Sequence, residues 1–249
     1  MAEWKIIHID ETDSTNRWLR ECPRNAALSM GELPIADSQR PIVVVADYQT
    51  AGRGCGSNTW ESERGKNLLY SMLIHPTDVP VSRQFLVSMA VANSIAKVVS
   101  RYVEDVSIKW PNDIYVRDQK LCGMLIENRL KGSVIKDSII GIGLNVNQLC
   151  FKSDAPNPVS LANLTGRMYD MEALLQKLLA VFDAEWADLD GVRSRYLSQL
   201  YRRKGFHRYR DASGEFSAEL MTVEDDGHLV LRDVDGRTNW YAFKEVRFV

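Results

Sequence analysis

The stretch Gln49-Thr-Ala-Gly-Arg-Gly-Cys-Gly-Ser-Asn-Thr-Trp60 follows the apolar, β-branched run Ile42-Val-Val-Val-Ala46. Such a run is typical of a buried strand. Glycines at this density let backbone N–H groups approach an anion, because no Cβ atom stands in the way. Arg53 adds a planar set of donors that suits a carboxylate or a phosphate. The stretch predicts a strand followed by an anion-binding loop, although a Gly-rich surface loop without a ligand would have the same composition.

The chain has 249 residues, which suits one large domain or a large domain with a small one. Lys and Arg number 31 against 33 Asp and Glu, so the net charge of -2 argues against a protein that binds mainly nucleic-acid phosphates. The first residues alternate like a strand and do not resemble a signal peptide, and no segment is apolar enough to span a bilayer. Cys22, Cys55, Cys122 and Cys150 show no CxxC spacing, which favours free thiols in a reducing cytoplasm over a zinc site or disulfides.

Alternating and helical patterns divide the chain into a large α+β part and a small β part. Strands are expected at residues 4–9, 42–46, 67–74, 106–110, 120–128 and 138–146. Helices are expected at 17–21, 84–103, 161–166 and 172–200, the last broken near Asp190-Gly191, while 22–40 reads as a connecting stretch. After Arg203, five short alternating runs separated by Gly-containing turns predict a small antiparallel barrel. We therefore divide the chain into residues 1–203 and 204–249.

Four clusters of polar residues fall at expected loops or strand ends, namely Ser14-Thr15-Asn16, Gln49–Trp60, Lys109-Trp-Pro-Asn-Asp113 and Lys120-Leu-Cys-Gly-Met-Leu-Ile-Glu127. Each has a structural explanation of its own, since the first fits a helix cap and most lysines are solvated. The segment between Lys109 and Lys120 reads as a strand, a tight turn and a strand, which brings both lysines near Asp113. Two ammonium groups, a guanidinium and a carboxylate suit a nucleoside triphosphate with Mg²⁺. No Gly-Lys-Ser/Thr phosphate loop is present, so the nucleotide is held in another way.

These blocks, together with Gly141-Ile-Gly-Leu-Asn-Val-Asn147, occur in the order found in biotin–protein ligases, and the chain resembles that family over residues 14–147. The resemblance implies a mixed sheet with flanking helices, similar to class II aminoacyl-tRNA synthetases, and an SH3-like C-terminal domain. It also implies the activity of a biotin–[acetyl-CoA-carboxylase] ligase. ATP and biotin form biotinyl-5′-adenylate, and a lysine of the biotin carboxyl carrier protein then attacks the mixed anhydride.

The resemblance also implies roles for individual residues. Lys120, Arg53 and Lys109 are implied as catalytic residues. The implied biotin-binding residues are Ser14, Thr15, Asn16, Gln49, Gly52, Arg53, Gly54, Cys55, Lys120 and Gly123. The implied ATP and adenylate contacts are Arg53, Trp60, Lys109, Asn112, Lys120 and Asn145. Trp60 and Trp110 would wall the site against water, and Asp113 would bind Mg²⁺ or orient the incoming lysine.

Two departures and two alternatives accompany this interpretation. Many relatives carry a second arginine after Gly-Arg-Gly, where this chain has Cys55, so retention of the adenylate is in question. About a dozen residues precede Ser14, so we expect no N-terminal DNA-binding domain and no DNA binding.

A lipoate–protein ligase would share the fold and the adenylate, but would prefer an apolar slot to Ser14-Thr15-Asn16. A non-catalytic binding module would leave Arg53, Lys109 and Lys120 without a joint purpose. The sequence leaves open whether the protein is a monomer or a homodimer.

Overall fold

The computed structural model describes residues 3–21, 40–56, 58–152 and 157–249. The connecting stretch expected over residues 22–40 lies outside the described residues except for Arg40, and so does Cys22. Within the described residues, no helix is long and apolar enough to cross a membrane.

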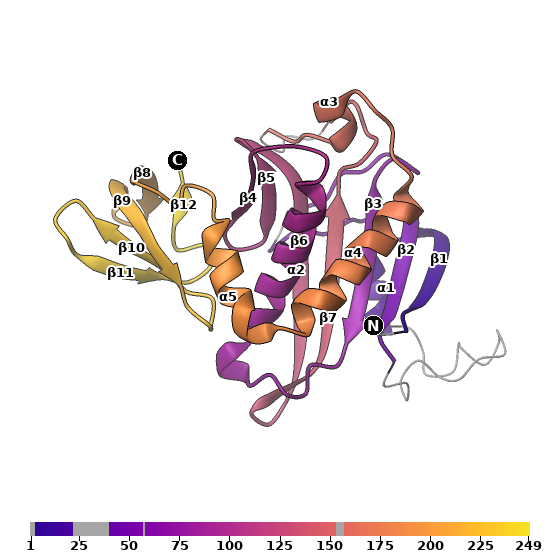
Figure 1. The fold of residues 1–249 in the computed structure, drawn as a ribbon, viewed down its shortest axis with the longest axis horizontal. Helices are drawn as coiled ribbons and strands as arrows, with labels where there is room; N and C mark the ends of the chain where they lie inside the picture. The colour runs from indigo at the N-terminus through magenta and orange to yellow at the C-terminus, as the bar shows by residue number, and fades with distance from the viewer. Residues whose placement is uncertain (1–2, 22–39, 57, 153–156) are drawn as a thin grey trace.

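Seven strands form the large sheet, in the order β1-β2-β3-β7-β6-β5-β4 (Figure 1). They are β1 (Lys5–Thr12), β2 (Ile42–Gln49), β3 (Leu68–Ile74), β4 (Val106–Lys109), β5 (Asp113–Val116), β6 (Gln119–Lys131) and β7 (Val134–Leu144). Strands β1 and β2 are parallel and every other neighbouring pair is antiparallel. The expected mixed sheet with flanking helices is confirmed.

Five α-helices and one 3-10 helix are present in the described residues. They are α1 (Thr15–Glu21), η3 (Val81–Arg83), α2 (Phe85–Val99), α3 (Leu161–Thr165), α4 (Met171–Trp186) and α5 (Leu189–Ser198). The long helical pattern after residue 171 breaks between α4 and α5, slightly before the expected Asp190-Gly191. Asp188 begins α5 there, because its side chain accepts a hydrogen bond from the N–H of Gly191.

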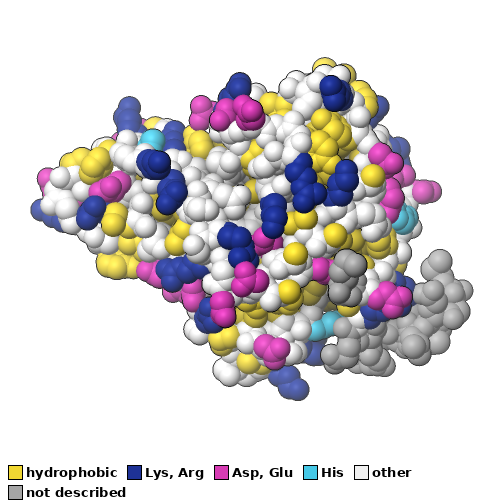
Figure 2. Space-filling view, in the orientation of Figure 1, with side chains coloured by type: hydrophobic (Ala, Val, Ile, Leu, Met, Phe, Trp, Pro, Cys, Tyr) yellow, Lys and Arg dark blue, Asp and Glu magenta, His cyan; other side chains and the backbone are white. Residues whose placement is uncertain are grey.

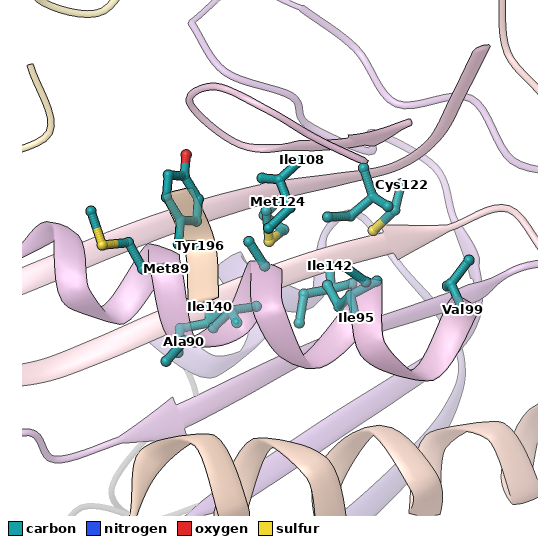
Figure 3. Close-up of a cluster of buried hydrophobic side chains, with 14 of the residues drawn as sticks. Met89, Ala90, Ile95, Val99, Ile108, Cys122, Met124, Ile140, Ile142 and Tyr196 are labelled. Atoms are coloured by element: carbon teal, nitrogen blue, oxygen red, sulfur yellow. The ribbon is translucent and has the colours of Figure 1, made fainter. Parts of the chain in front are cut away.

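Helix α2 is buried almost all round rather than on the one face that its periodicity predicts. It packs on the large sheet with α4 and α5 alongside it, so its second face is covered as well (Figure 1). Figure 3 shows Ala90 of this helix beside Ile140 of β7, and Ile95 beside Ile142. The main core therefore lies between the sheet and these three helices.

Helix α1 covers the other face of the same sheet. Strand residues alternate between faces, so Val43 of β2 joins the main core whereas Val44 packs with Leu19 of α1 and Ile139 of β7. Ile139, Gly141 and Gly143 of β7 thus lie on the α1 side of the sheet. Because α1 is short, it leaves the rest of this face open to form a pocket.

Between Lys109 and Lys120 the structure has two turns separated by a short strand, where the sequence predicted a single tight turn. Strand β5 pairs with both β4 and β6, and Asp113 is its first residue rather than part of a turn. Only Ile114-Tyr-Val116 carries a strand signal, and three residues are too few to predict a strand reliably from sequence.

Five strands after residue 205 form a second, antiparallel sheet in the order β11-β10-β9-β8-β12. They are β8 (Phe206–Asp211), β9 (Gly214–Val223), β10 (Leu229–Asp233), β11 (Thr238–Tyr241) and β12 (Arg247–Phe248), close to the five predicted runs. This sheet lies at one end of the molecule, and Figure 2 shows acidic and basic side chains interspersed over the face that carries α4 and α5. The C-terminal sheet contacts the large part through the Trp110 Nε1–H, which donates to Gly227 O at 2.9 Å.

Candidate active site

A pocket of about 600 Å³ lies on the α1 face of the large sheet. This is the size of a small-molecule site. Its lining residues come from the start of α1, the Gly-rich loop, strands β4 to β7 and the C-terminal segment. Of the residues predicted to contact ligands, those that line it are Ser14, Thr15, Asn16, Gln49, Arg53, Gly54, Cys55, Trp60, Lys109, Asn112, Asp113, Lys120 and Gly123. Segments that are far apart in the sequence thus meet at one cavity.

Three glycines on neighbouring strands form the floor of the pocket. A Cβ atom added to Gly141 would lie 2.3 Å from Asn16 Oδ1, and one added to Gly143 would lie 2.4 Å from the Trp60 ring. A Cβ at Gly123 would meet the same ring at 2.8 Å. Glycine in the middle of a strand often marks such a close approach. These strand positions therefore let Asn16 and Trp60 lie directly on the sheet.

Neutral polar side chains line the pocket at the start of α1. Gln49 Oε1 accepts hydrogen bonds from the Thr15 N–H at 2.8 Å and the Thr15 hydroxyl at 3.1 Å. Ser71 Oγ lies 2.7 Å from both Thr15 Oγ1 and Asn16 Oδ1. Ser14 precedes the helix and its carbonyl accepts from the Trp18 N–H, so Thr15 and Asn16 lie in the first turn with their side chains on the pocket. This end provides hydrogen-bonding groups without formal charge.

The Gly-rich loop is a closed turn held by its own backbone. The Trp60 N–H donates to Gly52 O at 2.9 Å, and the Gly54 N–H donates to Asn58 O at 2.8 Å. The Gly54 N–H is therefore not available to an anion in this conformation. Gly52 lies buried behind the loop, where a Cβ would stand 2.6 Å from Trp60 O. Arg53 extends from this turn, and its side chain is 46 % exposed.

Lys120 and Asp113 form an ion pair at the cationic end of the pocket. Lys120 Nζ lies 2.8 Å from Asp113 Oδ1 and 5.6 Å from the centre of the Trp60 ring. Burial raises the pKa of the Asp113 carboxyl above its ordinary value, and the neighbouring Lys120 offsets part of that rise. The lysine therefore compensates a largely buried carboxylate and stays oriented toward the pocket.

Lys109 occupies an aromatic enclosure at the same end. Its ammonium group lies 3.0 Å from the Tyr115 hydroxyl and 4.4, 5.7 and 5.4 Å from the ring centres of Tyr115, Tyr201 and Phe248. Burial lowers the pKa of Lys109, while Asp113 acts in the opposite direction. Cation–π contacts offset part of the cost of burying this charge.

Cys55 contributes a neutral thiol beside these charges. Asn112 Nδ2 donates to Cys55 Sγ at 3.0 Å and to Met124 O at 2.6 Å. Burial raises the pKa of the Cys55 thiol, so the group is protonated at neutral pH. Because Cys55 is neutral, the positive charge of the Gly-rich loop at the pocket comes from Arg53.

The predicted Mg²⁺ role of Asp113 does not fit its contacts. Its carboxylate already binds Lys120, and a cation placed there would displace or repel that ammonium group. In addition, no group of three or more His, Cys, Asp or Glu residues that could hold a metal ion occurs among the described residues. We therefore derive no step of the reaction through a metal bound by this carboxylate.

Residues 10–145, more than half of the chain, match the biotin/lipoate A/B protein ligase family. The chain belongs to that family. Among curated relatives, the bifunctional ligase/repressor BirA of Bacillus spizizenii is 28% identical over 95% of this chain and 72% of its own length. The biotin–[acetyl-CoA-carboxylase] ligase of Mycobacterium tuberculosis is 29% identical over 79% of this chain and 75% of its own.

Solved structures of ligases share the fold. The biotin protein ligase of Aquifex aeolicus in complex with biotin and ATP matches with a TM-score of 0.75, at 23% identity over 98% of this chain and 99% of that one. The Leishmania major ligase in complex with biotinyl-5-AMP matches with a TM-score of 0.64, at 21% identity over 96% and 98% of the two chains. The likeness extends through the C-terminal sheet.

Two residues of this chain that were predicted to contact ligands do not line the pocket in the part of the chain that the structure describes. Gly52 is behind the loop, and Asn145 donates from Nδ2 to Val159 O at 3.1 Å. Asn145 Oδ1 is buried without a hydrogen-bond partner in that same part of the structure. Direct ligand contact by either residue stays a prediction.

The pocket also contains residues that sequence reasoning did not assign. The C-terminal segment contributes Phe243, Lys244, Val246, Arg247 and Phe248. Phe243 packs on Trp110 with ring centres 6.5 Å apart, so both sheets contribute to the pocket wall. No local pattern indicates this, because these residues are more than 90 positions away from the nearest predicted block. Gly141 and Gly143 carried a detectable signal, since glycines within a strand indicate close packing.

Proposed function

We propose that this protein is an ATP-dependent biotin–[acetyl-CoA-carboxylase] ligase. It activates biotin as biotinyl-5′-adenylate and transfers the biotinyl group to a lysine of a biotin carboxyl carrier protein. The observation that carries this proposal is that one pocket has two different ends. One end is uncharged and hydrogen-bonding, at Thr15 and Asn16, and the other is cationic, at Arg53 and Lys120. Biotin has the matching polarity, with a neutral ureido ring at one end and a carboxylate at the other.

The uncharged end favours biotin over lipoate. The ureido ring has two N–H donors and one carbonyl acceptor, and Ser14, Thr15, Asn16 and Gln49 supply complementary groups. Ser71 and Gln49 hold the Thr15 and Asn16 side chains in place, so these groups are oriented before the ligand arrives. The dithiolane ring of lipoate has no N–H or C=O group, so it would cover these polar groups without forming hydrogen bonds to them.

The cationic end supports the adenylation step. A carboxylate oxygen of biotin attacks the α-phosphorus of ATP, an acyl–phosphate bond forms, and pyrophosphate leaves with the electron pair of the broken P–O bond. Negative charge grows on the phosphoryl oxygens, and in our proposal Lys120 and Arg53 stabilise it, assisted by Lys109. We also propose that Asn112 contacts the adenylate.

Transfer then consumes the adenylate. The neutral amine of the acceptor lysine attacks the acyl carbon, an amide bond forms, AMP leaves as the C–O bond of the mixed anhydride breaks, and the nitrogen releases one proton to solvent. Asp113 lies at this end of the pocket and is our candidate for orienting that amine. Trp60 and Trp110 limit the access of water, which would otherwise hydrolyse the adenylate.

The free thiols of Cys55, Cys122 and Cys150 support placing the reaction in a reducing cytoplasm.

Pyrophosphate release with different acids tests the proposal. The full chain is incubated with ATP and either biotin or lipoate, and each reaction is repeated with a biotin carboxyl carrier domain whose acceptor lysine is intact or replaced by arginine. We expect biotin-dependent pyrophosphate release, and a mass increase only on the domain with the intact lysine. Release driven by lipoate and not by biotin would reassign the protein to lipoate chemistry, and release by neither acid would reject a ligase function.

A further inference from the structure

Glu127 connects the two ends of the pocket, although it is not one of the lining residues. It lies on β6, and its Oε2 accepts a hydrogen bond from Asn16 Nδ2 at 2.9 Å. The same carboxylate binds Arg20 NH2 through both oxygens, at 3.1 and 3.0 Å, and lies 3.9 Å from Arg53 NH1. One carboxylate thus contacts the head-group end, the Gly-rich loop and the exposed side of α1.

The contact with Asn16 fixes the orientation of an amide. Asn16 Nδ2 donates one hydrogen to Leu125 O at 3.2 Å and the other to Glu127, so both amide hydrogens are used. Asn16 Oδ1 is then left as an acceptor beside Ser71. An amide held in this way presents an acceptor to an N–H donor of the ligand head group, whereas a flipped amide would present donors instead.

The contacts with the two arginines are unequal. Arg20 binds Glu127 through two short contacts, while Arg53 is near the outer limit of an ion pair. Two guanidinium groups share one carboxylate, so Arg53 can leave for an anion in the pocket while Glu127 keeps Arg20 as its counter-ion. Without Arg20, the full charge of Glu127 would act on Arg53.

We propose that Glu127 is a positioning residue that orients Asn16 for the head group and holds Arg53 beside the pocket, and that Arg20 weakens this hold so that Arg53 can bind phosphate. The proposal rests on the ligase function given above. It concerns residues on helix α1 and strand β6 that do not line the pocket, and it predicts that loss of Arg20 weakens nucleotide binding whereas loss of the Glu127 charge does not.

Binding measurements on three variants test this arrangement. Biotin and a non-hydrolysable ATP analogue are titrated separately by calorimetry into wild type, Glu127→Gln, Arg20→Gln and the double variant. Glu127→Gln should weaken biotin binding roughly ten-fold, because the charged partner of the Asn16 amide is lost. It should leave nucleotide binding equal to that of wild type or tighter, because Arg53 is released.

Arg20→Gln should have the opposite pattern. Nucleotide binding should weaken roughly three-fold, the size expected for a partly exposed ion pair, while biotin binding stays within two-fold of wild type. In the double variant, nucleotide binding should return to the Glu127→Gln value, because Arg20 acts only through the charge of Glu127. A purely structural role for either residue would give additive losses for both ligands.

Arg17→Gln is the matched control. Arg17 is on the same helix, pairs with Asp13 and Glu21, and does not line the pocket, so its loss removes the same charge without affecting Glu127. The proposal is overturned if Arg20→Gln binds nucleotide as wild type does, or if the effects of the two single substitutions on nucleotide binding simply add in the double variant. These outcomes are distinct from failure of the ligase function, in which wild type itself would bind no biotin and release no pyrophosphate.

Discussion

Lys120 and Asp113 form an ion pair across neighbouring strands, with Nζ and Oδ1 2.8 Å apart and side chains 29% and 19% exposed. The pair places an ammonium group at the pocket and compensates a carboxylate that burial disfavours. In the function proposed above, activity and stability depend on the same contact, so a substitution of Lys120 should change both. Two variants are needed to separate these effects.

We predict that Lys120→Ala lowers the rate of adenylate formation at least about 100-fold, because one preorganised charge is lost from the transition state. The free energy of unfolding should also fall by about 2 kcal/mol, because Asp113 loses its counter-ion. In Lys120→Ala/Asp113→Asn, stability should recover while activity stays low. Burst-phase pyrophosphate assays and urea denaturation measure the two quantities. Wild-type pyrophosphate release by folded Lys120→Ala would remove Lys120 from the reaction.

A second prediction concerns the floor of the pocket. Gly141→Ala places a methyl group 2.3 Å from Asn16 Oδ1, so the amide must move away from the head-group position. Biotin binding, measured by calorimetry, should weaken at least about ten-fold, whereas binding of the ATP analogue should change less than two-fold. Gly132→Ala, at the exposed turn between β6 and β7, is the matched control and should leave both affinities unchanged. Equal biotin binding by Gly141→Ala and wild type would exclude this role of Asn16.

Local patterns predicted much of the fold because hydrophobic periodicity reports which face of a segment is buried. The strands before β5, the helix α2 and the five C-terminal strands all carry such patterns over several residues. Strand β5 was missed because Ile114-Tyr-Val116 is short and follows a proline turn. The full burial of α2 was missed because periodicity cannot show that α4 and α5 cover its second face.

The candidate site was predictable where it depends on contiguous blocks. Ser14 to Asn16, the Gly-rich loop, Lys109 and Lys120 are such blocks, and they line one pocket. The contact of Glu127 with Arg20 joins residues 107 positions apart, and the C-terminal residues reach the pocket from another sheet. No local signal encodes these contacts, because they follow from how the two sheets and α1 pack together.

The third prediction concerns Cys55, which replaces the second arginine expected from the resemblance to biotin–protein ligases. Its thiol is held neutral by burial and accepts from Asn112, so it offers no charge to a phosphate. We predict that Cys55→Arg slows the loss of biotinyl-adenylate from the enzyme about ten-fold, because an exposed charge-assisted contact is gained. Release is measured by trapping free adenylate, with Cys55→Ser as the size-matched neutral control. If Cys55→Arg and Cys55→Ser release adenylate at the same rate, retention does not depend on this position.

Lys109 provides a prediction about pH. Burial lowers its pKa in the folded protein, so at neutral pH the folded state holds a proton on this group less favourably than the unfolded state does. The penalty is complete below the lowered pKa and disappears as the pH rises toward the ordinary value of 10.5. We therefore predict that the free energy of unfolding of wild type, relative to that of Lys109→Met, increases between pH 7 and pH 10. Over the same range, Lys109→Met should form adenylate at least about ten-fold more slowly than wild type does. Urea denaturation of both proteins across this range measures the difference, with Lys131→Met, at an exposed position, as the matched control. A difference that is constant or that falls with pH would show that the aromatic enclosure fully compensates the buried ammonium group.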